Sequence, residues 1–153
     1  MKRIAINGFG RIGRHVMRQL IVDPQVEVVA INDLVNAKML AHLFEFDTVY
    51  GRVPNAEISV DSEGILINGK VVKVFSERDP RNLPWKDLNV DLVLECTGIF
   101  KDEEKAGYHI QAGAKKVLIS APASGEIKNI VVGVNDNVIQ DDDVILSGAS
   151  CTT

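Results

Sequence analysis

The apolar positions of the chain fall into short β-branched runs separated by stretches with helical spacing. Residues 2–7 alternate and contain β-branched residues, and residues 26–32 are apolar nearly throughout, which predicts two buried strands with a helix between them. Asn36 precedes another helical pattern at residues 37–44 and is the residue type expected at a helix N-cap. Because the second strand is apolar nearly throughout, we expect a parallel sheet that is covered on both faces.

The middle of the chain has a different character. Asn68-Gly69 stands between the apolar segments 65–67 and 71–72, and this pattern predicts a tight β-hairpin. We therefore expect a small antiparallel insertion around residues 50–75. The parallel rhythm then resumes, with a helix expected at about residues 102–112 and strands at residues 90–94, 116–120, 130–134 and 144–147.

Length and charge limit the possible partners. A chain of 153 residues is the size of one domain, and its net charge of −4 argues against binding to a nucleic acid backbone. No apolar stretch is long enough to span a membrane, and the amino terminus does not resemble a signal peptide. Cys96 and Cys151 show no metal-ligand spacing. We expect a cytoplasmic protein with reduced thiols, no metal, no nucleic acid partner and no membrane partner.

A glycine motif follows the first predicted strand and opens the first predicted helix. Gly8, Gly10 and Gly13 have the Gly-x-Gly-x-x-Gly spacing of a dinucleotide-binding turn. In such a turn the first glycine allows a tight bend, the second leaves room for a pyrophosphate, and the third lets helix and strand pack closely. The unpaired amides of the helix start then face the phosphates. The alternative is a glycine-rich turn that binds nothing. The motif and the alternating elements together predict a Rossmann-type α/β fold with a mostly parallel, doubly wound sheet.

Asp33 completes this fingerprint at the end of the second predicted strand. It lies twenty residues after Gly13, where a carboxylate can accept hydrogen bonds from the adenosine ribose hydroxyls. The same charge would repel the 2′-phosphate of NADP, and the neighbouring Leu34 offers no compensating positive charge. We therefore predict NAD as the cofactor. A simple turn aspartate is the alternative interpretation.

Thr97 and Gly98 follow the third predicted parallel strand. The carboxyl ends of strands are where open α/β sheets bind ligands, so these residues are candidates for the nicotinamide side of the cofactor. A turn after a strand explains the same residues without any ligand.

Several stretches of the chain resemble one family in order from end to end. These stretches are residues 3–14, 30–33, 46–52, 77–80, 83–85, 96–100, 115–122, 133–135 and 149–153. Together they resemble the amino-terminal half of phosphorylating, NAD-dependent glyceraldehyde-3-phosphate dehydrogenases. The last stretch, Ala149-Ser150-Cys151-Thr152-Thr153, is similar to the active-site segment of that family and is highly specific. Tyr50 and Cys96 depart from the commonest family pattern, at positions to which we assign no role.

The resemblance assigns a role to each candidate site residue. It implies that Asn7, Arg11 and Ile12 surround the pyrophosphate with the glycines, and that Asp33 binds the ribose. It places Arg78 beside the adenine, and Thr97, Gly98 and Ser120 on the nicotinamide half. Cys151 matches the nucleophile, with Ser150 and Thr152 as neighbouring substrate-binding residues.

The family reaction is the glycolytic oxidation of glyceraldehyde 3-phosphate to 1,3-bisphosphoglycerate. The cysteine thiolate attacks the aldehyde to form a thiohemiacetal, hydride passes to NAD, and inorganic phosphate cleaves the resulting thioester. The resemblance also implies a homotetramer for the whole enzyme.

Residues 1–153 correspond to the NAD-binding domain only, so we expect the catalytic domain of the parent enzyme to be absent from this chain. His15, His42 and His109 fall on predicted helices, away from the strand ends, and we interpret them as surface or packing residues. We therefore predict that the chain alone does not complete the reaction and that Cys151 behaves as an unactivated thiol. Apolar surface normally covered by the second domain would favour self-association, which sedimentation would detect.

Two other interpretations stay open at this point. The chain is also similar to the NAD-binding half of erythrose-4-phosphate dehydrogenase, which shares the cofactor half and the nucleophile. The chain could instead act as a non-catalytic NAD-binding or protein-interaction fragment. Binding of NAD with little response to NADP would favour a dehydrogenase half.

Overall fold

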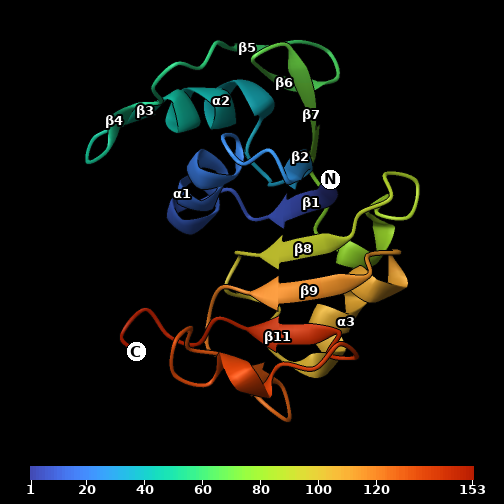
Figure 1. The fold of residues 1–153 in the computed structure, drawn as a ribbon. Helices are drawn as coiled ribbons and strands as arrows, with labels where there is room; N and C mark the ends of the chain where they lie inside the picture. The colour runs from blue at the N-terminus through green and yellow to red at the C-terminus, as the bar shows by residue number, and fades with distance from the viewer.

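The computed structural model describes all residues 1–153, and its centre is a nine-stranded sheet (Figure 1). The strand order is β10-β11-β9-β8-β1-β2-β7-β6-β5. In chain order these strands are β1 (Lys2–Asn7), β2 (Val26–Asn32), β5 (Ile58–Val60), β6 (Gly64–Ile67), β7 (Lys70–Phe75), β8 (Leu92–Glu95), β9 (Lys116–Ile119), β10 (Lys128–Asn129) and β11 (Ile145–Ser147).

The parallel part of the sheet runs from β10 to β7. The direction in which successive strands are added to it reverses at β1. The chain passes from β1 to β2 in one direction and then returns to β8 on the other side of β1, and β1 pairs in parallel with both neighbours. The carboxyl ends of β1, β8, β9 and β11 lie on the left in Figure 1. Such a switch point at the carboxyl edge is where open α/β sheets form a ligand crevice.

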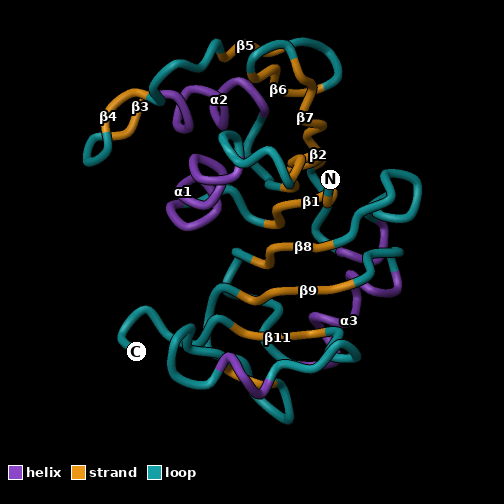
Figure 2. Tube along the Cα trace, in the orientation of Figure 1, coloured by secondary structure: helices purple, strands orange, loops and turns teal.

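Three helices cover the two faces, which confirms the doubly wound arrangement (Figure 2). Helices α1 (Arg11–Leu20) and α2 (Ala37–Glu45) pack on one face, and α3 (Glu103–Gln111) packs against β9 and β11 on the other. Two apolar clusters form the core. Met17 and Phe44 belong to the cluster under α1 and α2, whereas Val117 and the buried Trp85 belong to the cluster under α3.

Local signals account for the helix starts. The Asn36 side chain accepts a hydrogen bond from the Met39 amide, so the predicted N-cap of α2 is confirmed. Asp102 caps α3 in the same way by accepting from the Lys105 amide.

Short 3₁₀ turns occur at Pro80–Asn82 and Asp136–Val138. None of the helices has the length and apolar character that crossing a membrane would require.

The antiparallel insertion is confirmed and joins the main sheet. β6 pairs antiparallel with β5 and with β7, and β7 pairs in parallel with β2. The β6–β7 turn contains Asn68 and Gly69, with φ of 52° and 77°, as a left-handed hairpin turn requires. A separate two-stranded hairpin of β3 (Phe46–Asp47) and β4 (Gly51–Arg52) projects beyond α2.

The strand predicted at residues 130–134 is wrong. Only β10, at residues 128–129, belongs to the sheet, and the chain turns away directly afterwards. The Asn135 side chain accepts from the Val131 amide, and Gly133 has a φ of 85°, so the backbone forms a turn rather than a ladder. Val132 is consequently 85% exposed although its residue type favours a strand.

Candidate functional site

A cleft of about 470 Å³ opens at the carboxyl edge of the sheet. The ends of β1, β2 and β8 and the segment after β7 contribute its walls. The lining residues are Asn7, Gly8, Gly10, Asn32, Asp33, Leu34, Glu77, Arg78, Cys96, Thr97, Ile99 and Phe100. The cleft therefore lies at the switch point of the strand order, and it contains six of the residues expected at a cofactor site: Asn7, Gly8, Gly10, Asp33, Arg78 and Thr97.

The three glycines of the motif have different surroundings. Gly8 has a φ of 88°, and a Cβ added there would lie 2.8 Å from the Thr97 amide nitrogen. A Cβ at Gly13 would lie 2.3 Å from the Gly8 carbonyl oxygen, so this glycine brings α1 close to the preceding loop. A Cβ at Gly10 would meet no atom within 4 Å. Packing within the chain thus requires glycine at positions 8 and 13, whereas position 10 borders open space in the cleft.

The start of α1 is left open to a ligand. Gly10 is the N-cap residue and makes no side-chain cap, and the first turn contains no acidic residue. Amides at such a helix start carry the positive end of the helix dipole and bind anions. The loop therefore has both the space and the donors that a pyrophosphate needs.

Asp33 links the glycine loop to the end of β2 through hydrogen bonds. Its Oδ2 accepts a hydrogen bond from the Phe9 amide at 2.8 Å, and its Oδ1 accepts from the Val35 amide at 3.0 Å. The side chain lines the cleft at its β2 end. Its carboxylate can therefore meet a ligand hydroxyl while it keeps the loop in place.

The β8 side of the cleft is formed by the turn after Glu95. Thr97 lines the cleft and donates hydrogen bonds to Glu95 from its amide and its hydroxyl. Burial raises the pKa of the Cys96 thiol to about 11, although a hydrogen bond with Ser120 opposes this shift. Cys96 is therefore a protonated thiol at neutral pH, and it lines the wall of the cleft.

Five of the predicted cofactor residues lie outside the lining of the cleft. Gly13 is buried beneath the loop, and Gly98 is exposed with a φ of 74°. Ser120 is exposed beside Cys96. The remaining two, Arg11 and Ile12, lie on the exposed first turn of α1.

Arg11 makes an ion pair with Asp47 of the β3–β4 hairpin. Backbone amides of Tyr50 and Val49, together with the Arg11 guanidinium, lower the pKa of Asp47 to about 2. Asp47 is therefore ionised at any physiological pH and draws the Arg11 side chain toward the hairpin.

The active-site-like segment lies in a turn after β11, at the same edge of the sheet as the strand ends (Figure 1). The Thr153 amide donates to the Ser150 carbonyl at 3.1 Å, and the Ser150 and Thr152 hydroxyls are 2.9 Å apart. Cys151 is exposed at the tip of this turn. None of these residues lines the cleft.

The interpretation of the histidines needs one correction. His15 packs edge-on against Tyr50, and His42 is tilted against Phe46, as expected for surface residues. His109, in contrast, is fully buried and lies beside a strand end, because its Nε2 is 2.7 Å from Glu95 Oε2. The expectation that all three histidines lie away from the strand ends is therefore wrong for His109.

Sequence reasoning also gave no role to Asn32 and Glu95. These buried polar residues end β2 and β8, and each hydrogen-bonds the buried Asn7. The signal that could have revealed them is a polar residue at the end of a mostly apolar strand, as with Asn32 in β2 and Glu95 in β8.

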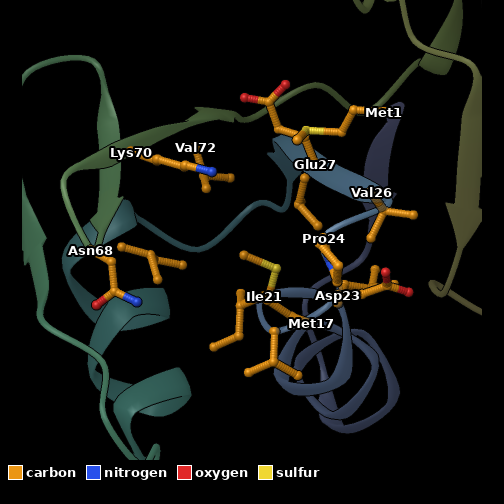
Figure 3. Close-up of a pocket in the computed structure, with 14 residues that line it drawn as sticks. Met1, Met17, Ile21, Asp23, Pro24, Val26, Glu27, Asn68, Lys70 and Val72 are labelled. Atoms are coloured by element: carbon orange, nitrogen blue, oxygen red, sulfur yellow. The ribbon is translucent and has the colours of Figure 1, made fainter.

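A second hollow lies at the opposite edge of the sheet (Figure 3). Its volume is about 240 Å³, and its walls include Met17, Ile21, Val26 and Val72. It contains none of the glycine-motif residues and no carboxyl end of a parallel strand. The larger cleft is therefore the candidate site.

Comparison with known proteins agrees with this geometry. The family described as "Glyceraldehyde 3-phosphate dehydrogenase, NAD binding domain" matches residues 2–103. A glyceraldehyde-3-phosphate dehydrogenase from Clostridium acetobutylicum is 57% identical over 153 residues, which is 100% of this chain and 46% of that protein. The enzyme of the same name from Thermotoga maritima is 51% identical over 155 residues, again covering 100% of this chain and 46% of that protein.

A third relative, from Geobacillus stearothermophilus, is 51% identical over 152 residues, or 99% of this chain and 45% of that protein. The chain thus spans about half the length of the curated relatives that it matches. With the cleft at the switch point and the glycine loop beside Asp33, these matches show that the chain belongs to the glyceraldehyde-3-phosphate dehydrogenase family and matches its NAD-binding domain.

Proposed function

We propose that this chain is the NAD-binding half of a phosphorylating glyceraldehyde-3-phosphate dehydrogenase. The observation that carries the proposal is the junction of the glycine loop and Asp33. An uncapped helix start, open space at Gly10 and a carboxylate hydrogen-bonded to the same loop together fit a dinucleotide without a 2′-phosphate. The names of the relatives favour the triose phosphate enzyme over the erythrose 4-phosphate enzyme.

Each part of the cofactor is assigned its own residues. In this proposal Gly8, Gly10 and the first-turn amides hold the pyrophosphate, with Asn7, Arg11, Ile12 and Gly13 around them. Asp33 accepts from the ribose hydroxyls, and Arg78 flanks the adenine. Thr97, Gly98 and Ser120 lie along the nicotinamide half. When bound, NAD supplies the hydride acceptor.

Cys151 is the proposed nucleophile of the whole enzyme. Its thiolate sulfur attacks the aldehyde carbon of glyceraldehyde 3-phosphate to form a thiohemiacetal, with Ser150 and Thr152 beside it. Loss of hydride from that carbon leaves a thioester, and a phosphate oxygen then displaces the sulfur to release 1,3-bisphosphoglycerate. A catalytic thiolate needs a neighbouring base or helix start for activation. In the structure no histidine hydrogen-bonds Cys151.

Titration calorimetry on the purified chain tests the cofactor site. We expect NAD to bind at least about tenfold more tightly than NADP, because Asp33 repels the 2′-phosphate. We also expect no NADH formation when glyceraldehyde 3-phosphate, phosphate and NAD are added, because the chain lacks an activating base at Cys151. Equal affinity for both cofactors would contradict the cofactor assignment, and steady NADH formation would contradict the second expectation.

The two cysteines are expected to differ in alkylation. Cys151 is exposed, whereas burial raises the pKa of Cys96 to about 11, so Cys96 stays protonated at pH 8. Because only thiolates react, iodoacetamide at pH 8 is expected to label Cys151 and to leave Cys96 largely unmodified. Peptide mass spectrometry measures both sites in one sample. The Cys151→Ser variant is the control, and rapid labelling of Cys96 in that variant would contradict the prediction.

Two further parts of the proposal concern assembly and location. We propose a homotetramer for the whole enzyme and a cytoplasmic location, as a glycolytic role implies. For the chain itself we predict self-association, which is supported by the exposed apolar side chains of Ile99, Val132 and Val134.

A further inference from the structure

A row of buried polar side chains runs along the floor of the cleft. Asn7, Asn32 and Glu95 are the last residues of β1, β2 and β8, and the register pairs Asn7 with both of the others. Asn7 Nδ2 donates to Glu95 Oε2 at 2.6 Å, and Asn32 Nδ2 donates to Asn7 Oδ1 at 2.7 Å. The row continues to the segment after β7, because Asn32 Oδ1 accepts from the Glu77 amide at 2.8 Å. Asn32 Nδ2 also donates to the Glu77 carbonyl at 2.9 Å.

His109 of α3 joins the row through its contact with Glu95. The Trp85 indole Nε1 donates to His109 Nδ1 at 3.0 Å. Since an indole nitrogen can only donate, Nδ1 must accept and the ring must carry its proton on Nε2. That Nε2–H donates to Glu95 Oε2 at 2.7 Å. The contact is therefore a hydrogen bond from a neutral imidazole to a carboxylate, with a fixed tautomer.

Glu95 receives donors at both of its oxygens. Oε2 accepts from Asn7 and His109, and Oε1 accepts from the Thr97 amide at 2.9 Å and the Thr97 hydroxyl at 2.5 Å. An ionised carboxylate only accepts, so it forces the Asn7 amide to present Nδ2 to it. Asn7 Oδ1 then faces Asn32, whose Nδ2 donates to it, while the Glu77 backbone orients the Asn32 amide by donating to its Oδ1 and accepting from its Nδ2. Glu95 therefore sets the direction of the Asn7 amide, and that direction agrees with the one that the Glu77 backbone sets at Asn32.

We propose that Glu95 and His109 act as a positioning pair for the cofactor cleft. The inference rests on the proposed function, because it assumes that the cleft holds NAD. Neither residue lines the cleft, yet Asn7, Asn32, Glu77 and Thr97 do, and all four depend on the row. The pair therefore aligns the turn after β8 with the ends of β1 and β2.

Glu95→Gln tests the role of the charge at nearly constant shape. Glutamine presents an amide NH₂ where one carboxylate oxygen stood, so donors face donors either at Asn7 and His109 or at Thr97. We expect the dissociation constant of NAD to rise roughly tenfold, as when one hydrogen-bonding partner is lost from a buried network. The side-chain NH₂ resonances of Asn7 are expected to shift in the NMR spectrum although Asn7 itself is unchanged.

His109→Gln and His109→Leu separate hydrogen bonding from volume. Glutamine can donate to Glu95 and accept from Trp85, whereas leucine can do neither, so we expect His109→Gln to retain more NAD affinity than His109→Leu. Ile65→Val is the matched control, because it trims a buried core side chain on β6 that does not line the cleft. It is expected to lower the midpoint of thermal unfolding without changing the affinity for NAD.

The two proposals fail in different ways. If Glu95→Gln binds NAD as tightly as the unchanged protein and leaves the Asn7 signal in place, the positioning role is overturned. A ¹⁵N spectrum that places the His109 ring proton on Nδ1 also overturns it. If the unchanged protein does not bind NAD, the proposed function fails, and the Asn7 signal still decides whether Glu95 orients the Asn7 amide.

Discussion

The Gly10→Ala variant is expected to keep its fold and to lose NAD affinity by more than about tenfold. A Cβ at this position meets no protein atom within 4 Å, so nothing in the folded chain opposes it. The same methyl group occupies the space that the loop leaves for the pyrophosphate, and it would push the phosphates away from the first-turn amides. Calorimetric titration with NAD and thermal unfolding, performed on the same sample, measure the two effects separately.

Gly13→Ala is the matched comparison for this prediction. Its Cβ would lie 2.3 Å from the Gly8 carbonyl oxygen, so α1 and the loop must move apart. We expect this variant to be destabilised by about 1–3 kcal/mol, as is usual when a closely packed site is overfilled. If Gly10→Ala instead loses stability and retains NAD affinity, the pyrophosphate does not lie over this glycine.

Asp33→Asn is expected to reduce the preference for NAD over NADP by at least about tenfold. The substitution removes the charge that disfavours a 2′-phosphate, and it weakens the bonds to the ribose hydroxyls, because hydrogen bonds to a charged group are worth about 1.5–3 kcal/mol. The measurement is a pair of titrations, one with each cofactor.

The Asp33 prediction needs a control for the aspartate's structural bonds, because its two oxygens also accept from the Phe9 and Val35 amides. Asp23→Asn provides it. Asp23 accepts from the Gln25 amide at the opposite edge of the sheet, where no part of the cleft lies. This control is expected to leave both affinities unchanged. An Asp33→Asn protein that still rejects NADP would show that another group selects the cofactor.

Local patterns were sufficient to predict much of the fold. The bounds of β1 and β2, the Asn36 cap and the hairpin at Asn68-Gly69 follow from residue type and spacing over a few positions. Residues 130–134 were mispredicted as a strand. Their β-branched residues favour a strand, but Gly133 and the Asn135 side chain form a turn there instead. Propensity alone does not reveal such competition.

The cofactor loop could be predicted because its residues are close in sequence. The glycine spacing and Asp33 belong to one strand–helix–strand unit, and Asp33 does contact the loop. The row of Asn32, Asn7 and Glu95 depends instead on the order of strands in the sheet, which brings together residues 88 positions apart. His109 joins this row from a helix that follows β8, so its partner became evident only with the packing of α3.

The hydrogen bond from the Phe9 amide to Asp33 has a consequence for the kinetics of cofactor capture. Because this bond joins two parts of the chain itself, it holds the phosphate-binding loop in place without any contribution from the dinucleotide. Preorganisation of this kind avoids the loss of conformational entropy that would accompany ordering of the loop on binding. We therefore expect capture in a single concentration-dependent phase, with no slower unimolecular step after the encounter.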